Sequence, residues 1–465
     1  MTNRTFLPSR RELLRSGFRV ATTVGTAAAF GQLGRVAALA QTTTTPSYQA
    51  LVCIFLFGGN DANNMVIPMV DSQTNGNATI YKNTRGSLGV SGALALGGTG
   101  YGLHPNMTAL QGLFNQSTNH VAVVFNVGTL ISPISSRSEY LAGKYASPSN
   151  LYSHSDQQLE WQTASPLEKV TSGWGGRLAD SYATCTSCAT SSINFPVGVS
   201  VAGNSTLLVG QSTQQASLDT SGFTLLGSGG ATPNSRDVAL QQVLKLNSGL
   251  TLLQSTDGIL GSAIEVANLI QSATGSGATL PVTFPDTSLG QQLAEVASLI
   301  KVRSALGASR QIFFASLGGF DTHTAETGTQ APLLQQLSDA VVALYQALAD
   351  PTIQAANLVT VFTESEFNRT FQPNSNGGTD HAWGGHHFVV GGAVKGGLYG
   401  TFPNLTLGGP SDADSDNRGL WFPTTGLDQY GATLANWFGV PSPSSLTSVF
   451  PNLVNFGTNQ TLGFV

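Results

Sequence analysis

The sequence predicts an α/β protein whose doubly wound, mostly parallel sheet is sandwiched by helices. Four short runs are mostly apolar, as in strands that are buried on both faces. Segments with a helical period lie between these runs, and this β-α-β order indicates a parallel sheet. Polar residues follow directly where three of the runs end. The four runs are residues 51–57, 120–128, 310–319 and 357–363.

The first α/β unit opens with the run at 51–57. This strand breaks at Gly58 and Gly59, and Asp61 follows almost immediately. The segment at 104–115 is expected to form a helix, because its larger apolar residues recur on one side. The run at 120–128 then completes the unit as a second buried strand.

The second half of the chain repeats this order. Helices are expected at 289–302 and 331–350, each ahead of an apolar run, and a closing amphipathic helix is expected at 424–440. Between the two halves, residues from about 165 to 285 are rich in Ser, Thr, Gly and Gln. We interpret this segment as a partly irregular insertion with a helix near 238–250.

The first 40 residues resemble a twin-arginine export signal. Arg10 and Arg11 precede a weakly apolar stretch that ends in an A-x-A cleavage pattern at 38–40. That stretch is too short and interrupted to span a membrane, and no later segment is long and apolar enough. We therefore expect a periplasmic or secreted mature protein of residues 41–465 without a transmembrane segment. An amphipathic N-terminal helix is the alternative interpretation.

The composition indicates where the protein acts and which partners are unfavourable. Charged residues make up 10% of the chain, where about 25% is usual, and this favours a secreted or cell-envelope protein. The formal net charge of -5 argues against a nucleic-acid partner. Cys185 and Cys188 form a lone C-x-x-C motif, so a zinc ribbon is excluded and a local disulfide or two free thiols remain.

Candidate ligand groups gather where the predicted strands end. Asp61 follows the first strand, Asp321 and His323 follow the third, and Glu366 follows the fourth. The loop GGTDHAWGGHH at 377–387 comes next along the chain. Open α/β sheets bind ligands outside the carboxyl ends of their strands, so we expect these groups to converge at one edge of the sheet.

The residue types predict a metal site, because mixed carboxylate and imidazole ligands suit zinc, manganese or iron. We expect two divalent ions, with zinc favoured and manganese, calcium or iron as alternatives. His386 is expected to face away or to support a ligand. The candidate ligands are Asp61, Asp321, His323, Glu366, Asp380, His381 and His387.

Most of these candidates also have a purely structural interpretation. Asp61 could be a turn residue or a helix cap, and Asp380 could cap a turn. Residues 321–323 could be the capped start of a helix. Glu366 could simply pair with Arg369. The metal-site hypothesis rests on the shared position of the candidates at strand ends.

The segment LYSHSDQQLEWQ at 151–162 offers the candidate nucleophile. Ser153 and His154 precede an apparent helix, and a serine at a helix N-terminus lies in a positive field that favours its alkoxide. Arg369 is the third candidate catalytic residue. A capping box that begins at Ser155 is the structural alternative. No G-x-S-x-G elbow, P-loop or dinucleotide-binding pattern is present.

The order of these motifs resembles the exported bacterial family called domain of unknown function 1501. The matching stretches span most of the chain that follows the export signal, apart from the insertion. They are LVCIFLFGGNDANNMVIP, LHPNMTALQGLF, LYSHSDQQLEWQ, LGGFDTHTAETGTQAPLLQQLSDAVVALYQAL, VTVFTESEFNRTFQPNSNGGTDHAWGGHHFVVGGAVKGGLYG and PTTGLDQYGATLANWFGV.

That family is grouped with the alkaline phosphatase and sulfatase superfamily. The resemblance implies an alkaline phosphatase-like sandwich with a binuclear metal site at the strand ends, and it implies Asp61, Asp321 and His323 as ligands. Glu366 stands where the superfamily usually has an aspartate, and a histidine of the glycine-rich loop supplies a further ligand. Ser153 matches the superfamily nucleophile by position rather than by motif.

The sequence therefore predicts an exported, metal-dependent hydrolase that acts on a phosphate or sulfate ester. The expected substrate is a small-molecule or polysaccharide ester. The alternative is a non-catalytic member of the superfamily that binds an envelope polysaccharide or a partner protein. A structural surface protein, suggested by the Ser/Thr/Gly-rich insertion, is a third hypothesis.

Overall fold

The structure is a computed structural model, and it describes residues 48–183, 195–218, 235–244, 251–274, 279–440 and 442–465. All of these residues belong to one compact unit, 48–465. The export signal expected in the first 40 residues and the Cys185/Cys188 motif lie outside the described residues, so both stay predictions.

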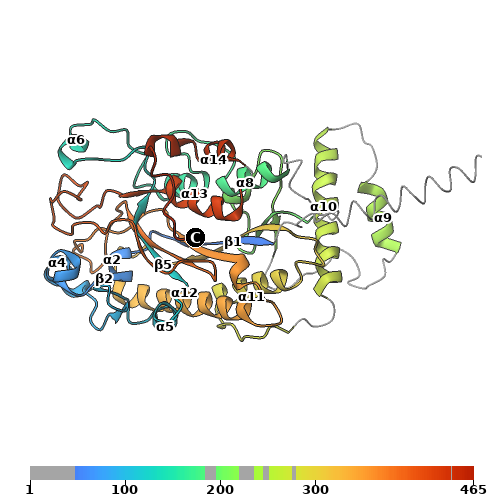
Figure 1. Cartoon of the computed structure of the whole chain (residues 1–465). Helices are drawn as coiled ribbons and strands as arrows, with labels where there is room; N and C mark the ends of the chain where they lie inside the picture. The colour runs from blue at the N-terminus through green and yellow to red at the C-terminus, as the bar shows by residue number, and fades with distance from the viewer. Residues whose placement is uncertain (1–47, 184–194, 219–234, 245–250, 275–278, 441) are drawn as a thin grey trace, which may run out of the picture. The chain divides into compact units, whose positions relative to one another are not determined.

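A nine-stranded sheet forms the centre of this unit (Figure 1). β1 (Gln49–Phe57) has β8 (Arg310–Gly318) and β9 (Val359–Glu364) as parallel neighbours. β10 (Gly385–Val390) runs antiparallel between β9 and β5 (Val121–Gly128). The predicted α/β class with a mostly parallel sheet is confirmed. The other strands pair in parallel: β6 (Gly198–Ser200) with β8, β7 (Ala216–Ser217) with β6, and β11 (Gly397–Tyr399) and β12 (Thr425–Gly426) with β5.

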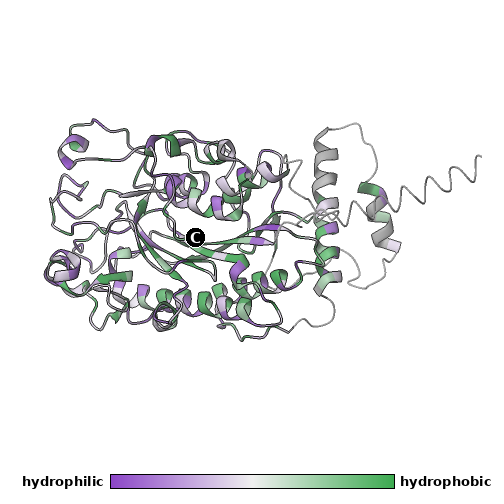
Figure 2. Ribbon diagram, viewed as in Figure 1, coloured by the Kyte–Doolittle hydropathy of each residue, from purple (hydrophilic) through white to green (hydrophobic). Residues whose placement is uncertain are grey.

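Helices cover both faces of the sheet (Figure 1), as expected of a doubly wound fold. Side chains of a strand alternate between faces, so Ile54 of β1 packs into one hydrophobic core and Phe55 into the other. Apolar residues are concentrated along the central strands (Figure 2). One layer holds α5 (Thr108–Phe114), α11 (Ser288–Lys301) and α12 (Glu326–Ala349), and the other holds α7 (His154–Thr163), α8 (Trp174–Ala183), α13 (Leu427–Phe438) and α14 (Pro443–Val449).

A small second sheet follows β1 along the chain, in the order β2 (Val66–Pro68), β4 (Tyr101–Leu103) and β3 (Leu94–Ala95). Its short strands lack the period on which the sequence prediction relied, so they were not expected. The remaining short elements are α2 (Ala62–Met65), α3 (Asp71–Thr74), α4 (Asn77–Thr84), α6 (Arg137–Leu141), η1 (Gly86–Leu88), η2 (Thr206–Leu208), η3 (Ala356–Leu358) and η4 (Pro451–Phe456).

The segment expected as an insertion is partly built into the main sheet. β6 and β7 extend the sheet beyond β8, and α8 packs on one of its faces. α9 (Ser235–Leu244) covers the first part of the helix predicted at 238–250, and the 24-residue α10 (Thr251–Thr274) was not predicted. The described residues of this segment therefore contribute strands and helices to the fold.

The glycine-rich segment at 377–387 does not end as a loop. His386 and His387 lie in β10, which is buried along its whole length between β9 and β5. The sequence prediction missed this strand because the Gly-Gly and His-His pairs hide its short apolar run. Because of this strand, His386 and His387 lie in the buried sheet and not in a loop.

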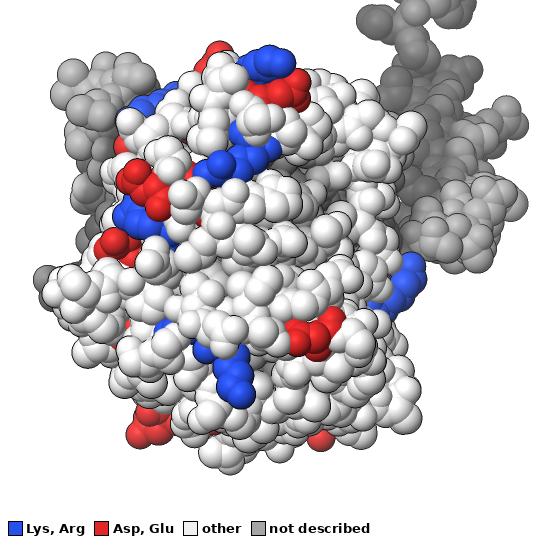
Figure 3. Space-filling model, turned by 90° about the vertical axis from the view of Figure 1, so that its left-hand side faces the viewer, with Lys and Arg blue, Asp and Glu red and all other residues white. Residues whose placement is uncertain are grey.

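The low charge content of the sequence is also visible on the surface. On the face drawn in Figure 3, basic and acidic side chains are few, some of opposite sign lie next to each other, and most of the surface is neutral. None of the described helices is long and apolar enough to cross a membrane.

Candidate metal centre

Loops at the carboxyl ends of β8 and β9 bring three candidate ligands close to His154, which was predicted as a catalytic residue. Asp321 and His323 follow β8, His381 lies between β9 and β10, and His154 is the first residue of α7. β8 and β9 are the two parallel neighbours of β1, so their carboxyl ends lie at the same edge of the sheet. The four side chains therefore meet beside the carboxyl ends of these strands.

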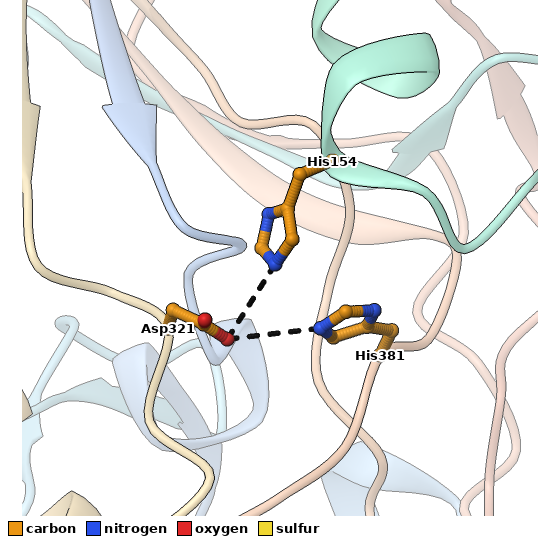
Figure 4. Close-up of side chains that lie close together, drawn as sticks. All are labelled: His154, Asp321 and His381. Carbon is orange, nitrogen blue, oxygen red and sulfur yellow. Dashed lines mark ion pairs between the residues drawn. The ribbon is translucent and has the colours of Figure 1, made fainter.

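Three imidazole nitrogens surround one carboxylate oxygen. Oδ1 of Asp321 lies 3.2 Å from Nε2 of His323. The same oxygen lies 3.6 Å from Nε2 of both His154 and His381, which approach it from two sides (Figure 4). The Nε2 atoms of His323 and His381 are 3.1 Å apart. We call these four residues the His/Asp cluster.

The other ring nitrogen of each histidine contacts an oxygen outside the cluster. Nδ1 of His154 lies 3.0 Å from Glu366, and Nδ1 of His323 lies 3.1 Å from Asp380. Nδ1 of His381 lies 2.8 Å from the carbonyl oxygen of Tyr152. A neutral imidazole that donates from Nδ1 keeps its Nε2 lone pair for a ligand, which is the arrangement of metal-binding histidines.

The donor set of the cluster fits a divalent metal ion. Nε2 of His154 is buried and has no hydrogen-bond partner among the described residues. A buried polar atom without a partner costs about 1–3 kcal/mol, unless a ligand uses its lone pair. Three imidazoles and one carboxylate are ligands that tetrahedral zinc takes in proteins. His154, Asp321 and His381 already lie close enough together to hold one ion.

The cluster has one closed side and one open side. The ring of Phe367 lies 4.5 Å from the ring of His381 and 4.8 Å from that of His154, measured between centroids. In contrast, the side chains of Asp321 and His323 are 48% and 44% exposed. A ligand from solution can therefore approach along the Asp321 side.

The pKa shifts of Asp321 and His381 favour the protonation states that bind a cation, whereas the shift of His154 does not. Burial alone would raise the pKa of Asp321, but Arg369 and the neighbouring imidazoles outweigh burial and lower it. The hydrogen bond to Glu366 raises the pKa of His154, whereas burial lowers the pKa of His381. Metal ligands must be deprotonated, so the ionised Asp321 and the neutral His381 are already in the required form.

Arg369, predicted as a catalytic residue, is fully buried and contacts the cluster through Asp321. Its guanidinium donates to Oδ1 of Asp321 and to the carbonyl oxygen of Gly58. It also donates to the carbonyl oxygens of Gly59, at 2.9 Å, and Thr379, at 3.2 Å. Arg369 thus joins the turn after β1 to both loops that carry ligands.

The structure does not bring Asp61 to the cluster. Asp61 caps α2 by accepting from the backbone N–H of Asn63 at 3.1 Å, and it forms a buried ion pair with Arg85. Arg85 also contacts Glu326 at 3.2 Å. Among the described residues, one group of side chains lies close enough together to hold an ion, and Asp61 is not part of it. The expectation of a second ion stays a prediction.

Glu366 and Asp380 lie behind the ligands, although both were predicted to bind a metal directly. Oε1 of Glu366 accepts from the backbone N–H of Gly58 at 2.8 Å and contacts His154, and Oε2 is buried without a partner among the described residues. Asp380 contacts His323. In these positions the two carboxylates orient imidazole rings.

His387 does not approach the cluster, which corrects its prediction as a ligand. Its ring packs 5.0 Å from Trp161 and 5.9 Å from Tyr430 in the core, with Nδ1 3.3 Å from Thr363. Burial lowers the pKa of His387 to about 3, so the ring stays neutral. His386, expected to face away, is buried on the same strand.

Ser153 is the N-cap of α7, so the predicted cap at Ser155 lies two residues too far along the chain. Oγ of Ser153 accepts from the backbone N–H of Asp156 at 3.5 Å and lies 3.2 Å from Oγ of Ser155. Ser153 stands directly before His154, at the margin of the cluster.

Three residues that support the cluster or its surroundings were not predicted from the sequence. The carbonyl oxygen of Tyr152 orients His381, and a backbone atom carries no sequence signal. Arg85 and Glu326 form a buried ion pair. Arg85 lies in a polar stretch without a motif, and Glu326 was hidden because the predicted helix at 331–350 began after it.

Comparisons with known proteins give a family and a weak structural likeness. No curated protein matches the sequence. Among solved structures, Ps i-CgsB in complex with k-i-k-neocarrahexaose is 10% identical, covers 88% of this chain and 77% of its own, and has a TM-score of 0.31. The lipoteichoic acid synthase LtaP from Listeria monocytogenes is 8% identical, with coverage of 86% and 74% and a TM-score of 0.32.

The 2-O GAG sulfatase BT1596 is similar at the same level, with 11% identity, coverage of 88% and 74%, and a TM-score of 0.31. Scores this low carry no activity across to this chain. The family model is the informative match, because it covers residues 48–410, which include β1 and every member of the His/Asp cluster. The chain belongs to the family described as protein of unknown function (DUF1501).

Proposed function

We propose that the protein is an exported hydrolase that cleaves a phosphate or sulfate ester with the help of one divalent metal ion, zinc in the first instance. The observation that carries this proposal is the convergence of three imidazole Nε2 atoms on Oδ1 of Asp321. The resemblance of the motif order to the alkaline phosphatase and sulfatase superfamily supports the class of ester.

The residues at this site have different roles in the proposed reaction. His154, His323, His381 and Asp321 would hold the ion, which would polarise an ester oxygen and activate water. Arg369 keeps Asp321 ionised and in place. The exposed edges of Asp321 and His323 leave one side of the cluster open for the substrate.

Ser153 is the side-chain nucleophile that this site offers. It caps α7, and the N-terminus of a helix stabilises an anion through its free N–H groups. Attack by the Ser153 oxygen on phosphorus or sulfur would expel the alcohol and leave an ester on the serine, which water then hydrolyses. Direct attack by water is the alternative, and a Ser153→Ala variant separates the two routes.

The expected location of this activity is the periplasm or the outside of the cell. This part of the proposal is supported by the arginine pair and the cleavage pattern of the first 40 residues and by the low content of charged residues. A small-molecule or polysaccharide ester in the cell envelope is the corresponding substrate class.

A panel of phosphate monoesters, phosphate diesters and sulfate esters tests the proposed activity. We expect the zinc-loaded protein to cleave at least one class, and chelation to abolish this cleavage. Asp321→Ala should lower kcat/KM by a factor of about 100 or more, because a loss of roughly 3 kcal/mol corresponds to such a factor. A zinc-loaded protein that cleaves no ester in the panel would refute the enzymatic proposal.

A second candidate function is metal-supported binding of an envelope polysaccharide or a partner protein without turnover. The observation in its favour is that the Ser153 hydroxyl bonds to α7 and contacts Ser155, with no hydrogen bond to the His/Asp cluster. Glycan-array binding that needs zinc, together with no ester cleavage, would favour this function over catalysis.

A further inference from the structure

We propose that Glu326, the first residue of α12, is a positioning residue of the metal centre. Its role is to fix the spacing of the two loops that carry the ligands. The inference rests on the proposed metal site. It goes beyond that site because Glu326 forms no hydrogen bond with any of the four cluster residues and acts only through the threonines next to them.

One carboxylate oxygen of Glu326 joins the two loops. Oε2 accepts from the hydroxyl of Thr322 at 3.3 Å and from the hydroxyl of Thr379. Thr322 stands between two ligands of the first loop, and Thr379 stands two residues before the ligand His381. Both threonines are buried, at 3% and 0% exposure, so water does not compete for these bonds.

The backbones of the two loops also lie in direct contact. The N–H of Thr379 donates to the carbonyl of Thr322 at 3.0 Å, and the N–H of Glu326 donates to that of Gly377 at 3.1 Å. A Cβ added to Gly378 would lie 2.3 Å from the carbonyl carbon of His323. The loops are thus packed so closely that a shift in one displaces the other.

The second oxygen of Glu326 is held by Arg85. NH2 of Arg85 lies 3.2 Å from Oε1, and the same guanidinium pairs with Asp61. Its NH1 donates to the carbonyls of Thr370, at 3.1 Å, and Phe371, at 2.9 Å. Both oxygens of the buried Glu326 carboxyl group are thus engaged, one by Arg85 and the other by the two threonine hydroxyls, and these contacts oppose rotation of the side chain.

The consequence is a measurable effect on metal affinity. Groups that orient metal ligands from behind change affinity by about 10–100-fold when they are removed. Glu326 acts one step further away, through hydroxyls beside the ligands. We therefore expect the loss of either hydroxyl to weaken zinc binding by about 10-fold, at the low end of that range.

Threonine-to-valine exchanges test this inference in the intact chain. Thr322→Val and Thr379→Val each remove one hydroxyl, whereas Thr379→Ser keeps the hydroxyl and removes only a methyl group. Thr360→Val is the matched control, because the Thr360 hydroxyl in β9 is equally buried but has no hydrogen-bond partner among the described residues. The readouts are the zinc Kd, from competition with a chromophoric chelator, and the melting temperature of the metal-free protein.

We expect a raised Kd for Thr322→Val and Thr379→Val, a Kd near the wild-type value for Thr379→Ser, and no change for Thr360→Val. A wild-type Kd in both valine variants would overturn the inference. So would an equal loss in Thr360→Val, because it would reduce the effect to general destabilisation. A wild-type protein that binds no zinc would instead refute the metal site itself. If a valine variant does not fold, Glu326→Gln is measured in the same way.

Discussion

Each histidine of the cluster has its own orienting oxygen, and the three oxygens come from different parts of the chain. Glu366 follows β9, Asp380 lies in the loop before β10, and the Tyr152 carbonyl precedes α7. This independence matters because the removal of one orienting group should loosen one ring and leave the other two in place. The orienting groups can therefore be tested singly.

Glu366→Gln should weaken zinc binding by about 10–100-fold, as expected when an orienting carboxylate is lost. Oε1 of Glu366 contacts Nδ1 of His154 at 3.0 Å, and a neutral amide holds that ring less firmly. Zinc titration of the variant measures the effect. Glu168→Gln, on the exposed surface, is the control. Equal affinity in Glu366→Gln and wild type would show that the His154 ring needs no carboxylate.

Glu364 should make the stability of the fold depend on pH. Burial raises the pKa of Glu364 from 4.5 to about 8, against bonds from Trp174 and Cys53 that lower it. The unfolded chain releases this proton near the usual value, so stability is highest below that pH and is lost as the pH rises through about 8.

Glu364→Gln removes this titration, and its urea midpoint should fall less than that of wild type between about pH 5 and about pH 9. Urea unfolding followed by tryptophan fluorescence measures both proteins. Parallel pH profiles of the two proteins would show that Glu364 is ionised in the folded state.

At the scale of elements, the turn after β1 packs directly against residues that form or support the cluster. Gly58 has a φ of +115°, and a Cβ there would lie 2.3 Å from the backbone nitrogen of Asp321. Its N–H donates to Glu366, and its carbonyl accepts from Arg369. A glycine is therefore required, both by conformation and by the close approach of the loop after β8.

Gly58→Ala should displace Asp321 and lower zinc affinity. Gly203→Ala is the matched control, since Gly203 also has a positive φ, +79°, but an added Cβ would meet no atom within 4 Å. Both variants should lose roughly 1–2 kcal/mol of stability from backbone strain. Zinc titration and urea unfolding separate the two effects, and equal zinc affinity in the two variants would contradict the proposed role of the turn.

Strands β1, β5, β8 and β9 were predictable from the sequence because a strand that is buried on both faces has a nearly continuous apolar run. The same signal placed Asp321 and His323 at a strand end. Sequence could not show where Asp61 points, because its contact with Arg85 joins residues 24 apart in the chain without any periodic pattern. It also could not separate His381 from His387, since the difference depends on the short strand β10.

At the scale of the whole molecule, the described part of the chain assembles one candidate metal centre at the edge of the sheet. Asp61, predicted as a metal ligand, instead forms an ion pair with Arg85 inside the protein. The central claim is that the His/Asp cluster binds one zinc ion.

Elemental analysis of the purified protein after equilibration with zinc and removal of unbound metal tests this claim most directly. We expect close to one zinc per chain in wild type, little or none in a His154→Ala/Asp321→Ala double variant, and an unchanged content in His120→Ala, which alters a histidine outside the cluster. A wild-type protein without bound metal, or a double variant that retains its zinc, would contradict the account.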